Sequence, residues 1–152
     1  MKSILLALLL LTNLYAYDKG DTISQEMAQH LGMNGHKLYV VDFFASWCGS
    51  CQKEVPLISQ FNQSINTSHV EIIGIDVDKN AQNGLDFQKQ LKAEGKLSFR
   101  VINDPQSVVI SKFNPKGMPT LYVIQNRKVL GIITGAVDHI DQKIAAYIKA
   151  TE

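Results

Sequence analysis

The first two thirds of the chain alternate between continuous apolar runs and segments in which apolar residues recur with helical spacing. Residues 37–45 and 70–77 are apolar runs rich in β-branched and aromatic residues, which is typical of strands buried on both faces. Residues 52–65 place apolar side chains every three or four positions and so predict an amphipathic helix. Residues 85–91 predict another helix. This order of elements indicates a parallel pair of strands joined by a helical crossover.

The pattern changes towards the C-terminus. Residues 99–102 predict a short strand, residues 107–113 a short helix, and residues 119–124 and 129–134 two further strands. Only residues 125–128 separate the last two strands, so they form an antiparallel hairpin. A final amphipathic helix follows. The predicted fold class is α/β, with a mixed central sheet flanked by helices on both faces.

The N-terminus has the layout of a secretory signal peptide. Lys2 precedes an unbroken apolar run over residues 4–11, and polar sequence begins at Asp18. The run is much shorter than the roughly 20 residues that span a bilayer, which favours a cleaved signal over a retained anchor. We place cleavage after Ala16. Residues 1–16 are then the signal peptide, and residues 17–152 form one exported domain.

Composition and charge exclude several kinds of partner. The chain has 152 residues and a formal net charge of +1, with no block of like charge. Nothing therefore predicts a nucleic-acid-binding surface or a polybasic membrane patch. Residues 76–80 begin like a calcium loop but lack the glycine and the glutamate that such a loop needs further on, so we assign no metal to them.

The chain has only two cysteines, Cys48 and Cys51. A bridge between them closes so short a loop that it adds little stability, and a scaffold held by disulfides would use more cysteines. A zinc site would need a second ligand pair at finger spacing, which the four histidines do not supply. The cysteine pair is therefore a candidate for redox chemistry.

The position of the pair predicts how it reacts. Two cysteines at i and i+3 at a helix start lie about one turn apart, close to the roughly 5–6 Å Cα separation that a disulfide needs. The free N–H groups and the dipole at the helix N-terminus stabilise the thiolate of Cys48. Cys48 is predicted to attack a substrate disulfide, and Cys51 to resolve the mixed disulfide by attacking Cys48. Trp47, Gly49 and Ser50 frame the sulfur and tune its potential.

The sequence around the cysteines resembles the active site of the thioredoxin superfamily. Residues 43–51 read Phe-Phe-Ala-Ser-Trp-Cys-Gly-Ser-Cys after a buried strand, and residues 51–56 continue Cys-Gln-Lys-Glu-Val-Pro. That continuation resembles exported thioredoxin-like thiol:disulfide interchange proteins (TlpA/ResA/DsbE-like). The match goes on, in the expected order, through residues 74–78, 103–105 and 117–120. The resemblance implies a thioredoxin fold and disulfide exchange with protein substrates.

Two acidic residues are candidates for moving protons near the pair. Asp42 interrupts a buried strand, where an unpaired carboxylate is costly. The resemblance implies that Asp42 lies beneath the cysteines and acts as general acid and base for Cys51; an exposed strand position is the alternative. Glu54 is either a second titrating group of the site or a first-turn glutamate that interacts with the helix dipole.

Met118, Pro119 and Thr120 stand where a predicted strand begins. Proline is tolerated there because no ladder hydrogen bond is lost. The resemblance implies more, namely a cis-proline loop that faces the cysteines and whose backbone pairs with bound substrate. We therefore expect a cis bond before Pro119, and a substrate-binding role for these three residues and for Trp47.

The predicted function is that of a thiol–disulfide oxidoreductase that uses a Cys-Gly-Ser-Cys motif to reduce proteins in the bacterial periplasm or cell envelope. Gly-Ser between the cysteines resembles the Gly-Pro of reducing thioredoxins. The resemblance implies a membrane thiol donor of the DsbD/CcdA type and, as one setting, cytochrome c biogenesis. We expect no cofactor, no metal, no nucleic-acid partner and a monomer. A disulfide-donating oxidase or isomerase and a non-catalytic Cu(I)-binding module are the alternatives.

Overall fold

The computed structural model describes residues 16–152 of the chain. A mixed five-stranded sheet forms its centre. The predicted signal peptide, residues 1–16, lies outside the described residues except for Ala16, so it and the boundary at residue 17 stay predictions. Within residues 16–152, no helix is both long enough and apolar enough to cross a membrane.

The strands lie in the order β3-β2-β1-β4-β5. β1 pairs in parallel with β2, and β2 with β3, whereas β4 is antiparallel to both β1 and β5. This arrangement confirms the predicted mixed sheet, with a parallel half followed by an antiparallel hairpin. The bounds of the strands are β1 Leu38–Phe44, β2 Val70–Asp76, β3 Arg100–Asn103, β4 Thr120–Gln125 and β5 Lys128–Thr134.

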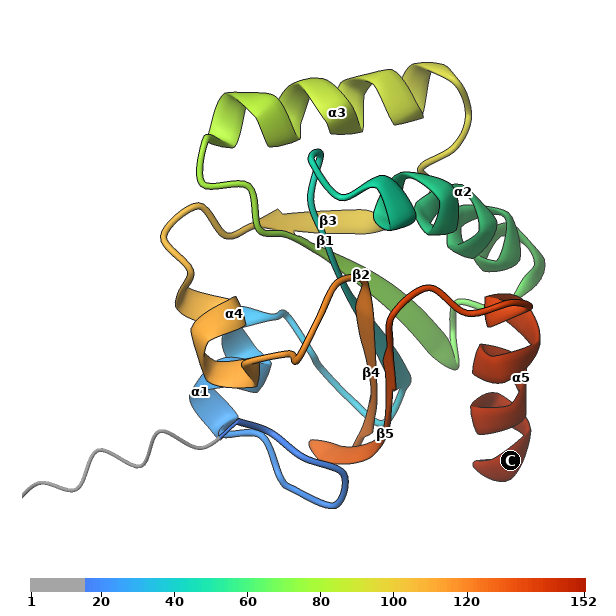
Figure 1. Ribbon diagram of the computed structural model, residues 1–152. Coiled ribbons are helices and arrows are strands. Elements are labelled where there is room, and N and C mark those ends of the chain that lie inside the picture. Colours follow the sequence, from blue (N-terminus) through green and yellow to red (C-terminus); the bar gives the residue numbers. More distant parts are fainter. Residues whose placement is uncertain (1–15) are drawn as a thin grey trace, which may run out of the picture.

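Helices cover both faces of the sheet (Figure 1). α1 and α4 lie on one side, α2 and α5 on the other, and α3 runs along the β3 edge. The predicted fold class, with helices on both faces of a mixed sheet, is therefore confirmed. The bounds of the helices are α1 Gln25–His30, α2 Gly49–Ser64, α3 Ala81–Ala93, α4 Val108–Phe113 and α5 Ile140–Ala150.

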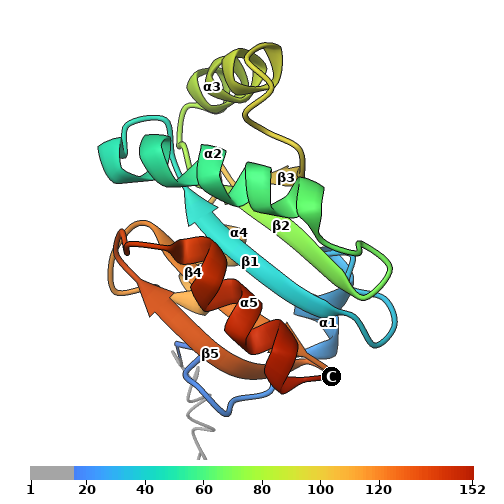
Figure 2. The ribbon, with the colours of Figure 1, turned by 90° about the vertical axis from the view of Figure 1, so that its right-hand side faces the viewer.

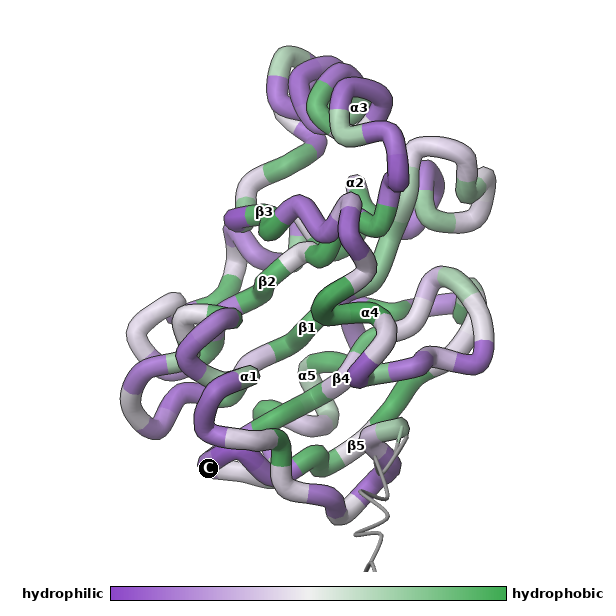
Figure 3. The backbone as a smooth tube through the Cα atoms, turned by 90° about the vertical axis from the view of Figure 1, so that its left-hand side faces the viewer, coloured by the Kyte–Doolittle hydropathy of each residue, from purple (hydrophilic) through white to green (hydrophobic). Residues whose placement is uncertain are grey.

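β1 is the centre of the core, and all seven of its residues are buried. Its side chains alternate between two apolar layers. Phe43 packs against Phe113 of α4 and Tyr122 of β4, with ring centroids 5.2 and 5.7 Å away. Phe44 points to the opposite layer, where its centroid lies 6.1 Å from that of Phe87 in α3. In Figure 3 the central strands are largely green and the outlying α3 mostly purple, as burial of the sheet requires.

Element ends differ from the sequence prediction where polar side chains act as caps or turns. α3 begins at Ala81 rather than residue 85, because the side chain of Asn80 accepts a hydrogen bond from the backbone of Gln82 at 3.0 Å. The hairpin turn is shorter than predicted, since Asn126 and Arg127 both adopt the left-handed conformation with φ of 51° and 65°. The polar residues on either side of this turn pair across the hairpin.

Candidate active site

The cysteine pair lies where the central strand ends and the long helix α2 begins (Figure 2). β1 ends at Phe44, the chain crosses a short loop, and α2 starts at Gly49. Cys48 is the N-cap of α2, and its Sγ accepts a hydrogen bond from the backbone N–H of Cys51 at 3.2 Å. A cap position of this kind places the sulfur next to the free N–H groups of the first helical turn. The predicted placement of Cys48 is confirmed.

The two cysteines form a disulfide, with their Cα atoms 5.2 Å apart, so the structure is that of the oxidised form. The two side chains differ in access to solvent. Cys51 is fully buried, while Cys48 is 7% exposed and follows the exposed side chain of Trp47. Of the two side chains, only that of Cys48 retains any exposure, which is the difference in access that the predicted order of attack requires. Gly49 and Ser50 lie between them in the first turn of α2.

Asp42 lies inside the protein on the side of the sheet that carries α2. It is 1% exposed, and neither of its carboxylate oxygens has a hydrogen-bond partner. The alternative of an exposed strand position is therefore wrong. Burial, with a smaller effect from the charge of Glu54 in α2, raises the pKa of Asp42 well above its usual range. The carboxyl group of Asp42 therefore holds a proton more tightly than an exposed aspartate does.

Glu54 is the sixth residue of α2, because the helix begins at Gly49. It is therefore not in the first turn, and the dipole interpretation of this residue is wrong. Glu54 is 4% exposed, and one of its oxygens has no hydrogen-bond partner. Burial raises the pKa of Glu54 to about 7, an effect that a hydrogen bond with the backbone of Val137 partly offsets. Two carboxyl groups with raised pKa values thus lie in the layer beneath α2.

The predicted cis-proline loop stands at the same end of the sheet. The bond between Met118 and Pro119 is cis, as expected. Thr120 is the first residue of β4 and pairs with Phe43 near the end of β1, so the loop lies beside the strand that leads to the cysteines. The Thr120 hydroxyl donates to the carbonyl of Gly117 at 2.7 Å and thereby closes the loop. Met118 is half-buried against the core.

The loop between β1 and α2 makes a contact that the sequence analysis missed. The backbone N–H and the hydroxyl of Ser46 both donate to the carboxylate of Asp78, each at 2.7 Å. The sequence signal for Asp78 is the acidic pair Asp76 and Asp78 at the carboxyl end of a buried strand, within residues 74–78 of the family resemblance. Among residues 16–152, no group of three or more histidine, cysteine or acidic side chains is arranged to hold a metal ion.

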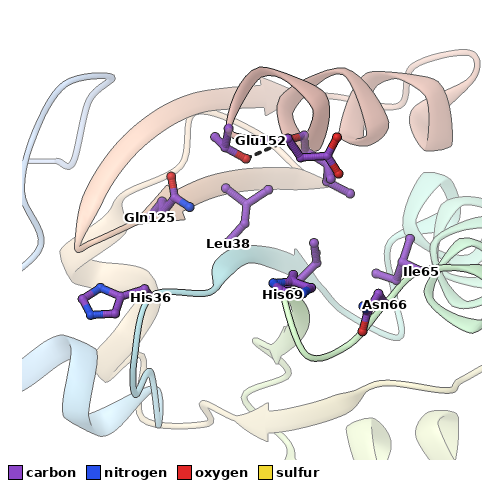
Figure 4. Close-up of a pocket in the computed structure, with 10 residues that line it drawn as sticks. His36, Leu38, Ile65, Asn66, His69, Gln125 and Glu152 are labelled. Carbon is purple, nitrogen blue, oxygen red and sulfur yellow. Dashed lines mark hydrogen bonds between the residues drawn. The ribbon is translucent and has the colours of Figure 1, made fainter.

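A cavity of about 470 Å³ lies at the opposite end of β1 (Figure 4). Leu38, at the start of β1, lines it together with His36, His69, Gln125 and Glu152. It contains none of the predicted site residues. The predicted site residues therefore lie towards the carboxyl end of β1 and not around this cavity.

Comparison with known proteins places this geometry in a family. A family model described as thioredoxin-like matches residues 34–129, which is more than half of the chain and includes both cysteines. The protein belongs to the thioredoxin-like family.

Several curated relatives carry oxidoreductase names. The thiol-disulfide oxidoreductase ResA of Geobacillus thermodenitrificans is 28% identical over 104 residues, which cover 68% of this chain and 58% of the relative. ResA of Geobacillus kaustophilus is 28% identical over 102 residues, covering 66% and 56%. A thioredoxin of Coprinus comatus is 27% identical over 75 residues, covering 49% and 67%. The chain thus spans little more than half the length of these ResA relatives.

Solved structures share the fold. A crystal structure described as the thiol:disulfide interchange protein DsbE from Chlorobium tepidum superposes with a TM-score of 0.73 at 24% identity and covers 89% of this chain and 98% of that one. StoA from Bacillus subtilis gives a TM-score of 0.66 at 19% identity, with coverage of 76% and 85%. These likenesses support the thioredoxin fold.

The raised pKa of Glu54 predicts that stability falls as pH rises. The folded state binds a proton at Glu54 up to about pH 7, whereas the unfolded chain releases it near its ordinary pKa of 4.5. Its contribution is fully present below pH 4.5 and is lost as pH rises through 7. Between pH 5 and pH 8, we expect the unfolding free energy of the parent protein to fall by roughly 1–3 kcal/mol more than that of Glu54→Gln.

Urea unfolding of the oxidised protein at the two pH values measures this difference. Glu26→Gln, at an exposed position of α1, is the matched control and should follow the parent protein. An equal decline in the parent protein and in Glu54→Gln would show that Glu54 is already ionised in the folded state.

Proposed function

We propose that this protein is a thiol–disulfide oxidoreductase that exchanges disulfides with protein substrates through Cys48 and Cys51. The observation that carries the proposal is the disulfide at the start of α2, in which Cys48 keeps a small exposed fraction of 7% and Cys51 is fully buried. The names of the ResA relatives agree with it.

In the reducing direction, the reduced protein begins the cycle. The thiolate of Cys48 attacks one sulfur of a substrate disulfide; a new S–S bond forms, the substrate bond breaks, and the released substrate thiolate takes up a proton. The thiolate of Cys51 then attacks the Cys48 sulfur, which closes the protein disulfide and releases the second substrate thiol. Two electrons pass to the substrate, and a thiol donor returns them to the protein.

The loop at the cis-proline supplies the substrate-binding surface in this proposal. Met118, Pro119 and Thr120 stand beside the end of β1, and the backbone of the half-buried Met118 is proposed to pair with an extended substrate strand. Trp47 is 65% exposed next to Cys48 and offers an aromatic surface to the substrate. Recognition through backbone pairing suits a protein that must accept many sequences.

Asp42 is proposed as the general acid and base for Cys51. Cys51 must lose its proton before it attacks, and the burial that protects it from water leaves few groups that can accept that proton. Both oxygens of Asp42 are free of hydrogen bonds. Glu54 is proposed as a second proton-holding group whose charge disfavours ionisation of Asp42.

The proposed direction is reduction, and the proposed location is the bacterial periplasm or cell envelope after removal of residues 1–16. Gly49 and Ser50 between the cysteines resemble the Gly-Pro of reducing thioredoxins. A membrane thiol donor of the DsbD/CcdA type would supply electrons, and cytochrome c maturation is one use of them. The mass of the protein recovered from an envelope fraction tests the cleavage after Ala16.

Single cysteine variants test the activity. With a disulfide-bonded protein such as insulin and excess dithiol, we expect the parent protein to accelerate reduction and Cys48→Ser to lose the acceleration. Cys51→Ser should instead accumulate a mixed disulfide through Cys48, visible by mass on a non-reducing gel. A mixed disulfide formed through Cys51 in Cys48→Ser would reverse the assigned roles.

Asp42→Asn tests the proton transfer. We expect formation of the mixed disulfide to change little and its resolution by Cys51 to slow by roughly a hundredfold near pH 7. Single-turnover quenching with a mass readout separates the two steps. Glu54→Gln is the comparison variant, with a smaller effect on resolution. If both steps slow equally in Asp42→Asn, the residue supports the fold and does not relay a proton.

The reduction potential of the pair tests the direction. Equilibration in graded dithiol buffers followed by thiol trapping should give a value near the roughly −270 mV of thioredoxin. A value near the roughly −120 mV of strong oxidants would make this protein a disulfide donor. A pair that does not re-form its bridge after reduction would favour the Cu(I)-binding alternative.

A further inference from the structure

We propose that Asp78 is a positioning residue for Cys48: it holds Ser46 in the loop between β1 and α2, and thereby fixes the direction in which Cys48 enters the helix. The inference rests on the proposed exchange chemistry and adds to it a residue outside the cysteine motif. It starts from the double contact in which the N–H and the hydroxyl of Ser46 donate to the two carboxylate oxygens of Asp78.

This contact fastens the loop to the neighbouring strand. Asp78 follows the end of β2, and the backbone N–H of Val77 donates to the carbonyl of Phe44, which continues the pairing of β1 and β2 up to the loop. On the helix side, Gln52 donates from its side chain to the carbonyl of Ser46 at 2.6 Å. Ser46 is thus tied through its N–H, its hydroxyl and its carbonyl, two residues before Cys48.

Asp78 is itself held by a buried polar chain. Its backbone N–H donates to one oxygen of Asp76 at 3.0 Å, and the side chain of Gln88 in α3 donates to the other oxygen at 2.7 Å. Gln88 also donates to the side chain of Asn103 at the end of β3 at 2.6 Å. Asp78, Asp76 and Gln88 are each 5% exposed or less. Ser46 is therefore held by a chain of hydrogen bonds that begins at Asn103 and Gln88, near the β3 edge of the sheet, and reaches it through the two aspartates.

Close packing leaves this chain little freedom. A Cβ atom added to Gly84 of α3 would come within 2.4 Å of an oxygen of Asp76, so helix and carboxylate are in direct contact. Burial raises the pKa of Asp76 to about 6, and the neighbouring carboxylate of Asp78 adds to the effect. Burying two adjacent carboxyl groups costs more free energy than filling the same space with apolar side chains. Their presence is accounted for if they set the geometry of the loop.

The geometry of the loop matters because Cys48 is the N-cap of α2. Its sulfur accepts the N–H of Cys51, and this contact and the helix dipole depend on the direction in which the chain enters the helix. A loosened Ser46 would let Cys48 turn away from the helix terminus. Less of Cys48 would then be thiolate at neutral pH, and its attack on a disulfide would slow.

The positioning role and a simple charge effect predict opposite results. A carboxylate near a thiol disfavours the thiolate, so loss of the Asp78 charge alone would make Cys48 more reactive at neutral pH. Loss of the Ser46 anchor would make it less reactive. Replacement of Asp78 by alanine removes both, whereas replacement by asparagine removes the charge and keeps an acceptor and the shape of the side chain.

The experiment is alkylation of the fully reduced, full-length protein by iodoacetamide across a pH series, with labelling of the Cys48 peptide followed by mass. We expect Asp78→Ala to lower the rate at neutral pH by roughly tenfold and to shift the profile to higher pH by about one unit. Asp78→Asn should keep most of the labelling rate of the parent protein. Ser46→Ala keeps the backbone contact and should give an intermediate loss. Asp86→Asn, an exposed acidic position on α3, is the charge control and should match the parent.

Two outcomes would overturn the proposal. Faster labelling in both Asp78→Ala and Asp78→Asn would show a charge effect, and an unchanged pH profile in Asp78→Ala with only a lower unfolding free energy would show a structural role. If circular dichroism shows that Asp78→Ala does not fold, Ser46→Ala provides the test. A labelling rate of Cys48 in Ser46→Ala equal to that of the parent protein would refute the anchor. Alkylation needs no protein substrate, so the result is independent of whether the proposed exchange activity is found.

Discussion

The burial of β1 on both faces is the constraint on which the rest of the structure depends. Because β1 is the middle strand, its neighbours fix its register from both sides, and its end delivers the chain to the start of α2. Cys48 therefore reaches the helix terminus with little freedom. The same burial makes Asp42 unusual, since it is 1% exposed and neither of its carboxylate oxygens has a hydrogen-bond partner. One apolar strand thus supplies both the placement of the sulfur and the environment of the acid.

Most of the fold could be predicted from the sequence because strong periodic patterns cover the strands and the two longest helices. The order of elements and the hairpin follow from local spacing alone. The prediction failed at element ends, where single side chains decide: the Asn80 cap lengthens α3, and the left-handed Asn126 and Arg127 shorten the turn. These details depend on one or two hydrogen bonds and leave little trace in hydrophobic periodicity.

The candidate site was predictable to the extent that it is contiguous in sequence. The cysteine motif and its helix position could be read directly, and the cis bond before Pro119 was expected from resemblance. Glu54 was open to two interpretations because the start of α2 was unknown, and only the true first residue, Gly49, excludes the first turn. The contact between Ser46 and Asp78 joins residues 32 positions apart, so the acidic pair at the end of β2 marks one partner of the contact but does not identify the other.

The contact between Glu54 and the backbone of Val137 has a consequence for the architecture of the domain. Val137 lies in the loop before α5, and α5 packs against α2. The segment that leads into the last helix therefore contacts one of the two buried acids beside the cysteines. During synthesis, the cysteines and acids emerge before Val137, so the environment of Glu54 is complete only after the C-terminal segment has folded. Any engineered shortening or re-ordering of the C-terminal segment would change the active site as directly as a substitution within it.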